Sequence, residues 1–176
     1  MKLKTTLSIL AASGLLSLTG VAYADNTITF DGEVVDTTCE PAVANGDYTV
    51  VLDQVAKSDL SAVGIYSGVS TPFSLQFINC PATATQVGVV LNSSTYDATT
   101  GNLTDVAGYG SDAVQIAVQE TAGGPVMVGA GAPASFVPVV NGTASIPLTA
   151  NYYVKDIAGV TVGVIKTTAV YSVRTQ

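Results

Sequence analysis

The sequence contains no histidine, and only six of its 176 residues are lysine or arginine, against 13 aspartates and glutamates. Histidine is the commonest base beside a serine or cysteine nucleophile, so its absence removes the usual hydrolase mechanism. With two cysteines and no histidine, zinc would lack the four ligands it needs. Nucleic acids and anionic membranes are bound through clustered basic residues, which are scarce here. We expect no enzyme activity, no metal or other cofactor, and no nucleic acid partner.

Residues typical of exposed helix faces are also scarce, since lysine, arginine and glutamate together make up a small part of the chain. Valine, threonine, tyrosine and glycine are abundant instead, and most of these favour strands and turns over helices. After the first apolar stretch there is no second run of 18 or more apolar residues, so no membrane-spanning helix is expected. The composition predicts an all-β domain with few helices.

The N-terminus has the pattern of a secretory signal peptide. Lys2 and Lys4 precede an apolar stretch of about 12 residues, and Ala22-Tyr23-Ala24 is an A-x-A cleavage pattern. We predict a signal peptide at residues 1–24 and one domain at residues 25–176. Removing the two lysines lowers the formal charge from −7 to −9 and leaves the basic residues scattered singly. They are Lys57, Lys155, Lys166 and Arg174.

Cys39 and Cys80 are the two cysteines of the chain. In an exported protein, an even number of cysteines is most simply explained by a disulfide. A metal site is the alternative, and the lack of histidine argues against it. A disulfide closing a loop of about 41 residues contributes roughly 4 kcal/mol in the chain-entropy model.

Strand-length runs of β-branched and aromatic residues recur along the chain between clusters of glycine, proline, asparagine, aspartate and serine. Asn141-Gly142 is a strong signal for a two-residue hairpin turn. The expected strands are residues 28–34, 48–52, 73–80, 86–91, 113–119, 136–140, 144–153 and 163–174. Strands at this spacing without intervening helical patterns predict an antiparallel sandwich.

The aspartates do not suggest a catalytic carboxylate pair. Most of them lie in predicted turns, where aspartate commonly hydrogen-bonds to its own backbone. A structural role in turns is therefore expected for Asp47, Asp53, Asp59, Asp97, Asp105, Asp112 and Asp156.

The segment after the cleavage site is an amphipathic strand. Ile28, Phe30, Gly32 and Val34 fall on one face, and Thr27, Thr29, Asp31 and Glu33 fall on the other. A glycine on an inward face weakens a strand by itself and marks close approach by another backbone or a bulge. The segment is either an ordinary first strand or a strand offered to another chain by β-augmentation.

Several pieces in order resemble fimbrial subunits of the chaperone-usher pathway, in particular type 1 pilins. They are ITFDGEVVDTTC up to Cys39, FINC ending at Cys80, DAVQIAVQ, NGTASIPLTANYYV and the closing TTAVYSVRTQ. No single piece is decisive, but the ordered set covers essentially the whole chain after residue 24. In this family the penultimate residue is usually aromatic, and here it is Thr175.

The resemblance implies an incomplete immunoglobulin-like β-sandwich that is completed by a donor strand from another subunit. It implies that residues 25–36 are the donor-strand extension, with Asn26, Ile28, Phe30, Gly32 and Val34 on its inward face. It also implies that Cys39 and Cys80 form the family disulfide. The strand that lines the groove and binds the chaperone would carry Gly163, Ala169, Tyr171 and Val173.

The expected function is that of a structural subunit which polymerises by donor-strand exchange in a type 1-like fimbria that supports adhesion. Its expected partners are other pilin subunits, a periplasmic chaperone and an outer-membrane usher, on an export route through the periplasm to the cell surface. The resemblance leaves the subunit's place in the fibre, rod or tip, open. The alternatives are a self-contained secreted β-sandwich binding module and, more remotely, a secreted hydrolase.

Overall fold

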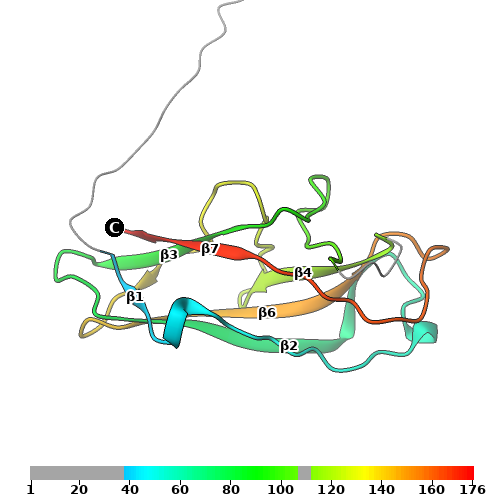
Figure 1. Ribbon diagram of the computed structural model, residues 1–176, viewed down its shortest axis with the longest axis horizontal. Helices are drawn as coiled ribbons and strands as arrows, with labels where there is room; N and C mark the ends of the chain where they lie inside the picture. Colours follow the sequence, from blue (N-terminus) through cyan, green and yellow to red (C-terminus); the bar gives the residue numbers. More distant parts are fainter. Residues whose placement is uncertain (1–37, 107–111) are drawn as a thin grey trace, which may run out of the picture. The chain divides into compact units, whose positions relative to one another are not determined.

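Two antiparallel sheets build the domain in the computed structural model, which describes residues 38–106 and 112–176 (Figure 1). The first sheet has the strand order β1-β2-β6-β4, and the second has the order β5-β3-β7. The strands are β1 (Glu40–Pro41), β2 (Gly64–Ile78), β3 (Gln86–Asn92), β4 (Val114–Glu120), β5 (Val137–Pro138), β6 (Ala144–Val154) and β7 (Val170–Thr175). Two 3₁₀ turns, η1 (Ala44–Gly46) and η2 (Lys57–Asp59), complete the described elements.

The core lies between the inner faces of the two sheets. Strands β2 and β6 alternate buried and exposed side chains, as expected for strands with one face turned inward. Phe77 of β2 and Leu148 of β6 are each only 1% exposed. They belong to one cluster with β3 and β4, whose members from these two strands are Val87, Val89, Leu91, Ile116 and Val118. The predicted all-β sandwich is therefore confirmed.

The predicted hairpin turn at Asn141-Gly142 is also found. Both residues have positive φ angles, 52° and 73°, as a two-residue hairpin turn requires. Val140 and Thr143 form a bridge across the turn, and the N–H of each donates to the carbonyl of the other. The turn joins β5 in one sheet to β6 in the other, so the chain changes sheets at this corner.

The disulfide predicted from the sequence joins Cys39 to Cys80, 41 residues apart. Cys39 directly precedes β1, and Cys80 lies two residues after the end of β2. Since β1 pairs with the end of β2 at Ile78 and Phe77, the covalent link and the strand pairing hold the same two segments together.

Four predicted strands differ from the structure. β2 begins at Gly64, nine residues before the predicted start, and β5 covers only Val137–Pro138 of the predicted residues 136–140. Residues 48–52 belong to no strand, because Tyr48 occupies the edge of β2 with its side chain: its hydroxyl accepts from the N–H of Gln76 at 2.9 Å and donates to the carbonyl of Gln76 at 3.0 Å. The final strand begins at Val170 rather than at residue 163. Val170 pairs with Asn92, the last residue of β3, so no ladder partner remains for the residues before it.

Within the described residues, no helix is both long enough and apolar enough to cross a membrane. The signal peptide predicted at residues 1–24 and the donor strand predicted at residues 25–36 lie outside the described residues.

Candidate assembly edge along the final strand

Strand β7 bonds to β3 with every second residue. Gln176 and Gln86 exchange both backbone hydrogen bonds, at 2.9 and 3.0 Å, which makes them a hydrogen-bonded antiparallel pair. Because such pairs alternate with non-hydrogen-bonded pairs, Arg174, Ser172 and Val170 also direct their peptide groups toward β3. The peptide groups of the odd-numbered residues between them point away from β3, and no described strand lies on that side.

The same alternation continues before β7, although the contacts there are of another kind. The N–H of Lys166 donates to Asp105 Oδ1 at 2.7 Å, and the Lys166 carbonyl accepts from the N–H of Val106 at 2.7 Å. The carbonyl of Thr168 accepts from Ser93 Oγ at 2.7 Å. Even-numbered residues thus bond to one side throughout residues 166–176. The open side extends back from β7 to Ile165, Thr167 and Ala169.

Several side chains along this open side face the core but remain partly exposed. Ile165, Tyr171 and Val173 are half-buried and pack against the main hydrophobic cluster. Thr167 has a buried hydroxyl with no hydrogen-bond partner within the described part of the chain. A buried hydroxyl without a partner is unfavourable, so this position lacks a group that would normally complete it.

Residues 48–52 approach β7 at Tyr48, and in Figure 1 the segment after η1 runs in the opposite direction to β7. Tyr48, Val50 and Leu52 are half-buried against the same cluster, while the residues between them are exposed. The Tyr48 and Tyr171 rings meet edge to face with centroids 6.1 Å apart. The Tyr171 hydroxyl donates to the carbonyl of Gly46 at 2.8 Å, and burial is the main cause that raises the pKa of Tyr171.

We call the odd-numbered residues from 165 to 175, together with residues 48–52 opposite, the acceptor edge. Its peptide groups have no strand partner among the described residues. Its apolar side chains remain half-exposed. An edge of this kind is a template for another strand, because the main chain supplies hydrogen bonds and alternate side chains supply pockets. The geometry is suited to binding a strand.

The structure places the residues predicted for this site in different surroundings. Tyr171 and Val173 lie on the acceptor edge as predicted, facing the core. Ala169 also lies on the edge but is exposed, and Gly163 is exposed and lies seven residues before β7. The predicted donor residues Asn26, Ile28, Phe30, Gly32 and Val34 lie outside the described residues, so their role stays a prediction.

Part of this site was not predicted from the sequence. The pattern of residues 48–52 predicts an ordinary strand and does not link Tyr48, Val50 and Leu52 to the final strand. Their alternating pattern indicated a half-buried face, but not what would cover that face. Ile165 and Thr167 were likewise included in a predicted strand without a role of their own.

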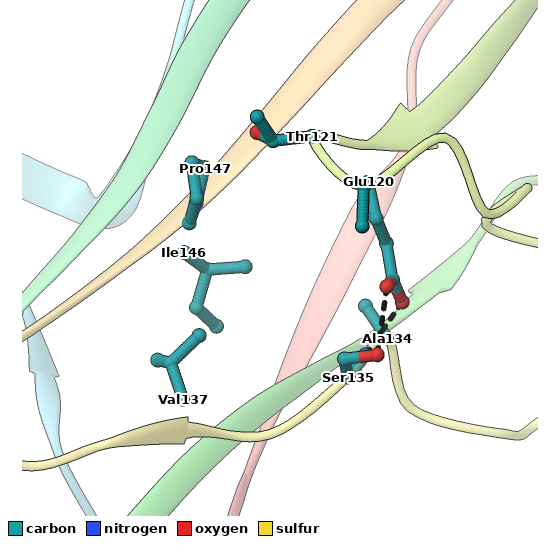
Figure 2. Close-up of a pocket in the computed structure, with 8 residues that line it drawn as sticks. Glu120, Thr121, Ala134, Ser135, Val137, Ile146 and Pro147 are labelled. Atoms are coloured by element: carbon teal, nitrogen blue, oxygen red, sulfur yellow. Dashed lines mark hydrogen bonds between the residues drawn. The ribbon is translucent and has the colours of Figure 1, made fainter.

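A separate hollow of about 240 Å³ lies near the ends of β4 and β5 (Figure 2). Its wall is largely apolar, with Val137, Ile146 and Pro147 on one side. Glu120 is the acidic residue in it, and both of its oxygens accept hydrogen bonds at 2.7 Å, one from the N–H and one from the hydroxyl of Ser135. The carboxylate thus fixes the loop before β5.

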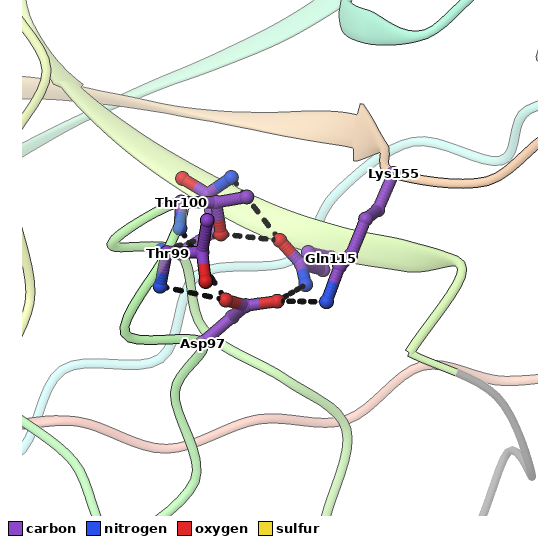
Figure 3. A network of polar contacts seen from close by, with 6 residues as sticks. Asp97, Thr99, Thr100, Gln115 and Lys155 are labelled. Carbon is purple, nitrogen blue, oxygen red and sulfur yellow. Dashed lines mark hydrogen bonds and ion pairs between the residues drawn. The ribbon is translucent and has the colours of Figure 1, made fainter.

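A polar network ties the loop at residues 97–102 to β4 (Figure 3). Gln115 is fully buried; its amide donates to Asp97 Oδ2 at 2.8 Å, and its carbonyl accepts from the Thr100 hydroxyl at 2.7 Å. Asp97 also pairs with Lys155 and accepts from the N–H of Thr99 at 2.8 Å. The hydrogen bond from Lys155 is the largest cause that holds the pKa of Asp97 well below its usual range.

This network confirms the turn role predicted for Asp97, because the carboxylate accepts from two backbone N–H groups of its own loop. Its contacts with Gln115 and Lys155 were not predicted, since those residues are distant in the sequence. Among the described residues, no group of three or more histidine, cysteine, aspartate or glutamate side chains is placed to hold a metal ion.

A family model described as "Fimbrial protein" matches residues 28–176 of the chain. The chain is 32% identical over 184 residues to the F17 fimbrial protein of Escherichia coli, covering 99% of each protein. It is 30% identical over 159 residues to the probable major fimbrial subunit LpfA of Escherichia coli O157:H7, covering 88% of each.

Solved structures agree with the fold. The crystal structure of the P pilus rod subunit PapA superposes with a TM-score of 0.64 at 19% identity, covering 80% of this chain and all of that one. A subunit in the structure of a chaperone-usher pilus superposes with a TM-score of 0.63 at 21% identity, covering 87% of this chain and 96% of that one.

Proposed function

The chain belongs to the fimbrial protein family and is a structural fimbrial subunit, and from that premise we propose that it polymerises by donor-strand exchange. In this proposal, residues 25–36 of one subunit enter the acceptor edge of the next. Ile28, Phe30, Gly32 and Val34 face the core of that neighbour. The observation that carries the proposal is the row of unpartnered peptide groups beside half-exposed apolar side chains along residues 165–175.

The inward face of the donor strand fits this edge chemically. Ile28, Phe30 and Val34 are apolar, as are the half-buried side chains they would meet, among them Tyr171 and Val173. Fully burying an aliphatic or aromatic side chain contributes about 1.5–3 kcal/mol, so a strand with three such residues supplies a substantial driving force. Adding a strand would also give partners to the peptide groups of the odd-numbered residues.

Before assembly, the same edge would need a temporary cover, because an open apolar strand edge promotes aggregation. We assign that role to a periplasmic chaperone that binds along β7, followed by passage through an outer-membrane usher to the cell surface. The signal peptide at residues 1–24 would direct the chain to this route. Relatives named as major fimbrial subunits favour a place in the fimbrial shaft.

The test compares the chain of residues 25–176 with a variant that lacks residues 25–35. The first should form polymers visible by electron microscopy and size-exclusion chromatography. The second should remain unpolymerised and should bind a synthetic peptide copying residues 25–36. The matched control is the same peptide with Gly32→Leu, which should not bind because the added side chain would meet the core.

Two results would contradict the proposal. A truncated variant that is a well-folded monomer, indifferent to the peptide and to a chaperone, would instead support a self-contained binding module. Polymers that still form without residues 25–35 would show that another surface drives assembly.

A further inference from the structure

Charges on the outer face of the acceptor edge match charges on the N-terminal strand in their spacing. Lys166 and Arg174 are eight residues apart, and Asp25 and Glu33 are also eight residues apart. We infer, on the basis of the donor-strand exchange proposed above, that these charges select the register of the inserted strand. Asp25 would face Arg174 of the neighbouring subunit, and Glu33 would face Lys166.

The basic residues are placed to act on a strand in this position. Lys166 and Arg174 are exposed and lie at even-numbered positions, on the side opposite the half-buried residues of the edge. Beyond residue 24 the chain has only two other basic residues, and one of these, Lys155, already pairs with Asp97. The segment opposite β7 is flanked by the exposed residues Asp47 and Asp53, which are acidic and would not attract an acidic strand. The attraction would therefore come from the basic residues on the β7 side.

The hydrogen-bond pattern of residues 166–176 places both charge pairs at positions where the Cα atoms of antiparallel strands are closest. Every strand pair within the described residues is antiparallel, so we place the added strand antiparallel to β7. If Asp25 faces Arg174 in such a pair, Glu33 necessarily faces Lys166. Even-numbered residues turn their peptide groups away from the added strand and form non-hydrogen-bonded pairs with it, whose Cα atoms are about 4.5 Å apart instead of about 5.5 Å.

The inner face of the strand favours the same register. Phe30, its largest inward residue, then lies opposite Ala169, which is small and exposed. Gly32 lies opposite Thr167, where the absence of a side chain leaves room for the Thr167 hydroxyl to reach the incoming main chain. This would supply a partner for a buried hydroxyl that lacks one among the described residues.

A shifted register loses these features. A shift of two residues keeps the same face inward, so the inward alternation alone does not exclude it. Such a shift retains at most one charge pair, between Asp31 and Lys166, and moves Phe30 from Ala169 to Thr167 or Tyr171.

The register can be read from interchain disulfides in polymers of the full chain after residue 24. In the proposed register Thr27 faces Ser172, so Thr27→Cys with Ser172→Cys should cross-link neighbouring subunits, because Cα atoms about 4.5 Å apart suit a disulfide. Thr27→Cys with Val170→Cys, and Thr29→Cys with Ser172→Cys, report shifts of two residues in either direction. Non-reducing gel electrophoresis measures the cross-linked fraction of each pair.

Charge variants then test whether the charges select that register. Introduced into each of the three cysteine pairs, Arg174→Glu should lower the ratio of the cross-linked fraction of the proposed pair to that of the shifted pairs by on the order of fivefold, since exposed ion pairs are individually weak. Adding Asp25→Lys to Arg174→Glu should restore the ratio. Lys57→Glu makes the same charge change at an exposed residue of η2 and should leave the ratio unchanged.

The outcomes separate this inference from the proposed function. Polymers that cross-link through a shifted pair, or an Arg174→Glu effect no larger than that of Lys57→Glu, would overturn the charge-selected register and leave donor-strand exchange intact. Polymers in which none of the three pairs cross-links would count against both. Cross-linking through the proposed pair, weakened by Arg174→Glu and restored by Asp25→Lys, would support the inference.

Discussion

The two sheets differ in how their outer strands are used. In the β1-β2-β6-β4 sheet, the longest strands, β2 and β6, pair along most of their length, and the core residues Phe77 and Leu148 are almost completely covered. In the β5-β3-β7 sheet, β7 is bonded on one side only within the described residues, and Val170 at its start is 68% exposed. In the first sheet β6 is paired on both sides, whereas the second sheet ends at β7, an edge whose inward apolar side chains are only half covered.

From this contrast we expect stability and the proposed assembly to depend on different residues. The disulfide and the longest strand pair belong to the first sheet, and the most deeply buried side chains come from both sheets, Phe77 and Leu148 in the first and Val87 and Val89 in the second. The acceptor edge adds less to the stability of the isolated domain, because its side chains remain partly in water. Substitutions of core residues should therefore mainly lower the stability of the domain. Substitutions on the acceptor edge should mainly weaken polymerisation.

The largest effect on stability is expected at Phe77. Phe77→Ala removes a ring that is 1% exposed and packs edge to face with Tyr171, so it should lower the free energy of unfolding by about 3–5 kcal/mol. Urea denaturation followed by circular dichroism measures the loss.

The matched substitution on the open side is Val173→Ala. Because Val173 is half-buried, its loss should cost about 1 kcal/mol or less in unfolding, but it should weaken polymer formation more than that cost explains. An equal loss of stability at Phe77 and Val173 would break the distinction between the two sides.

An intermediate effect is expected at Gln115. Gln115→Leu removes the buried amide that bonds to Asp97, Thr100 and Asn102, and should cost about 1–3 kcal/mol because these groups lose a partner. Polymerisation by subunits that do fold should be unaffected, since this network is formed by β4 and the loop at residues 97–102. Gln86→Leu, at an exposed residue of β3, is the control and should change stability little.

The smallest effect is expected from acid. The pKa of Asp97 is lowered in the folded state by Lys155 first and then by Gln115, so the ionised form contributes stability above the unfolded-state pKa of about 3.9. That contribution is lost as the pH falls below this value toward the lower folded-state pKa. Urea midpoints measured from pH 6 to pH 2 should fall less steeply for Asp97→Asn than for the unaltered chain.

Asp53→Asn, at an exposed aspartate without a side-chain hydrogen bond to a described residue, is the control for acid sensitivity. A pH dependence that is unchanged in Asp97→Asn but altered in Asp53→Asn would show that Asp97 is not responsible.

Much of the fold was predictable because it depends on local patterns. The Asn141-Gly142 turn follows from two residues that tolerate positive φ, and β3, β4 and β6 lie within one residue of their predicted bounds. The predicted strand at residues 48–52 was wrong because a side chain, Tyr48, replaces the main-chain pairing. The Gln115 network was missed because the partners of a buried amide are set by contacts between distant segments.

The sequence by itself determined the all-β class of this protein, its hairpin turn, and the disulfide between its two cysteines. Periodicity decides which side chains face inward, and turn residues decide where strands end, so both can be read without a structure. Only the tertiary structure decided which strand edge remains open, because the partner of an edge is a property of residues far apart in the chain. The tertiary structure shows that the peptide groups from residue 166 to residue 176 alternate in direction. Those on one side are bonded, and those on the other side face no described strand.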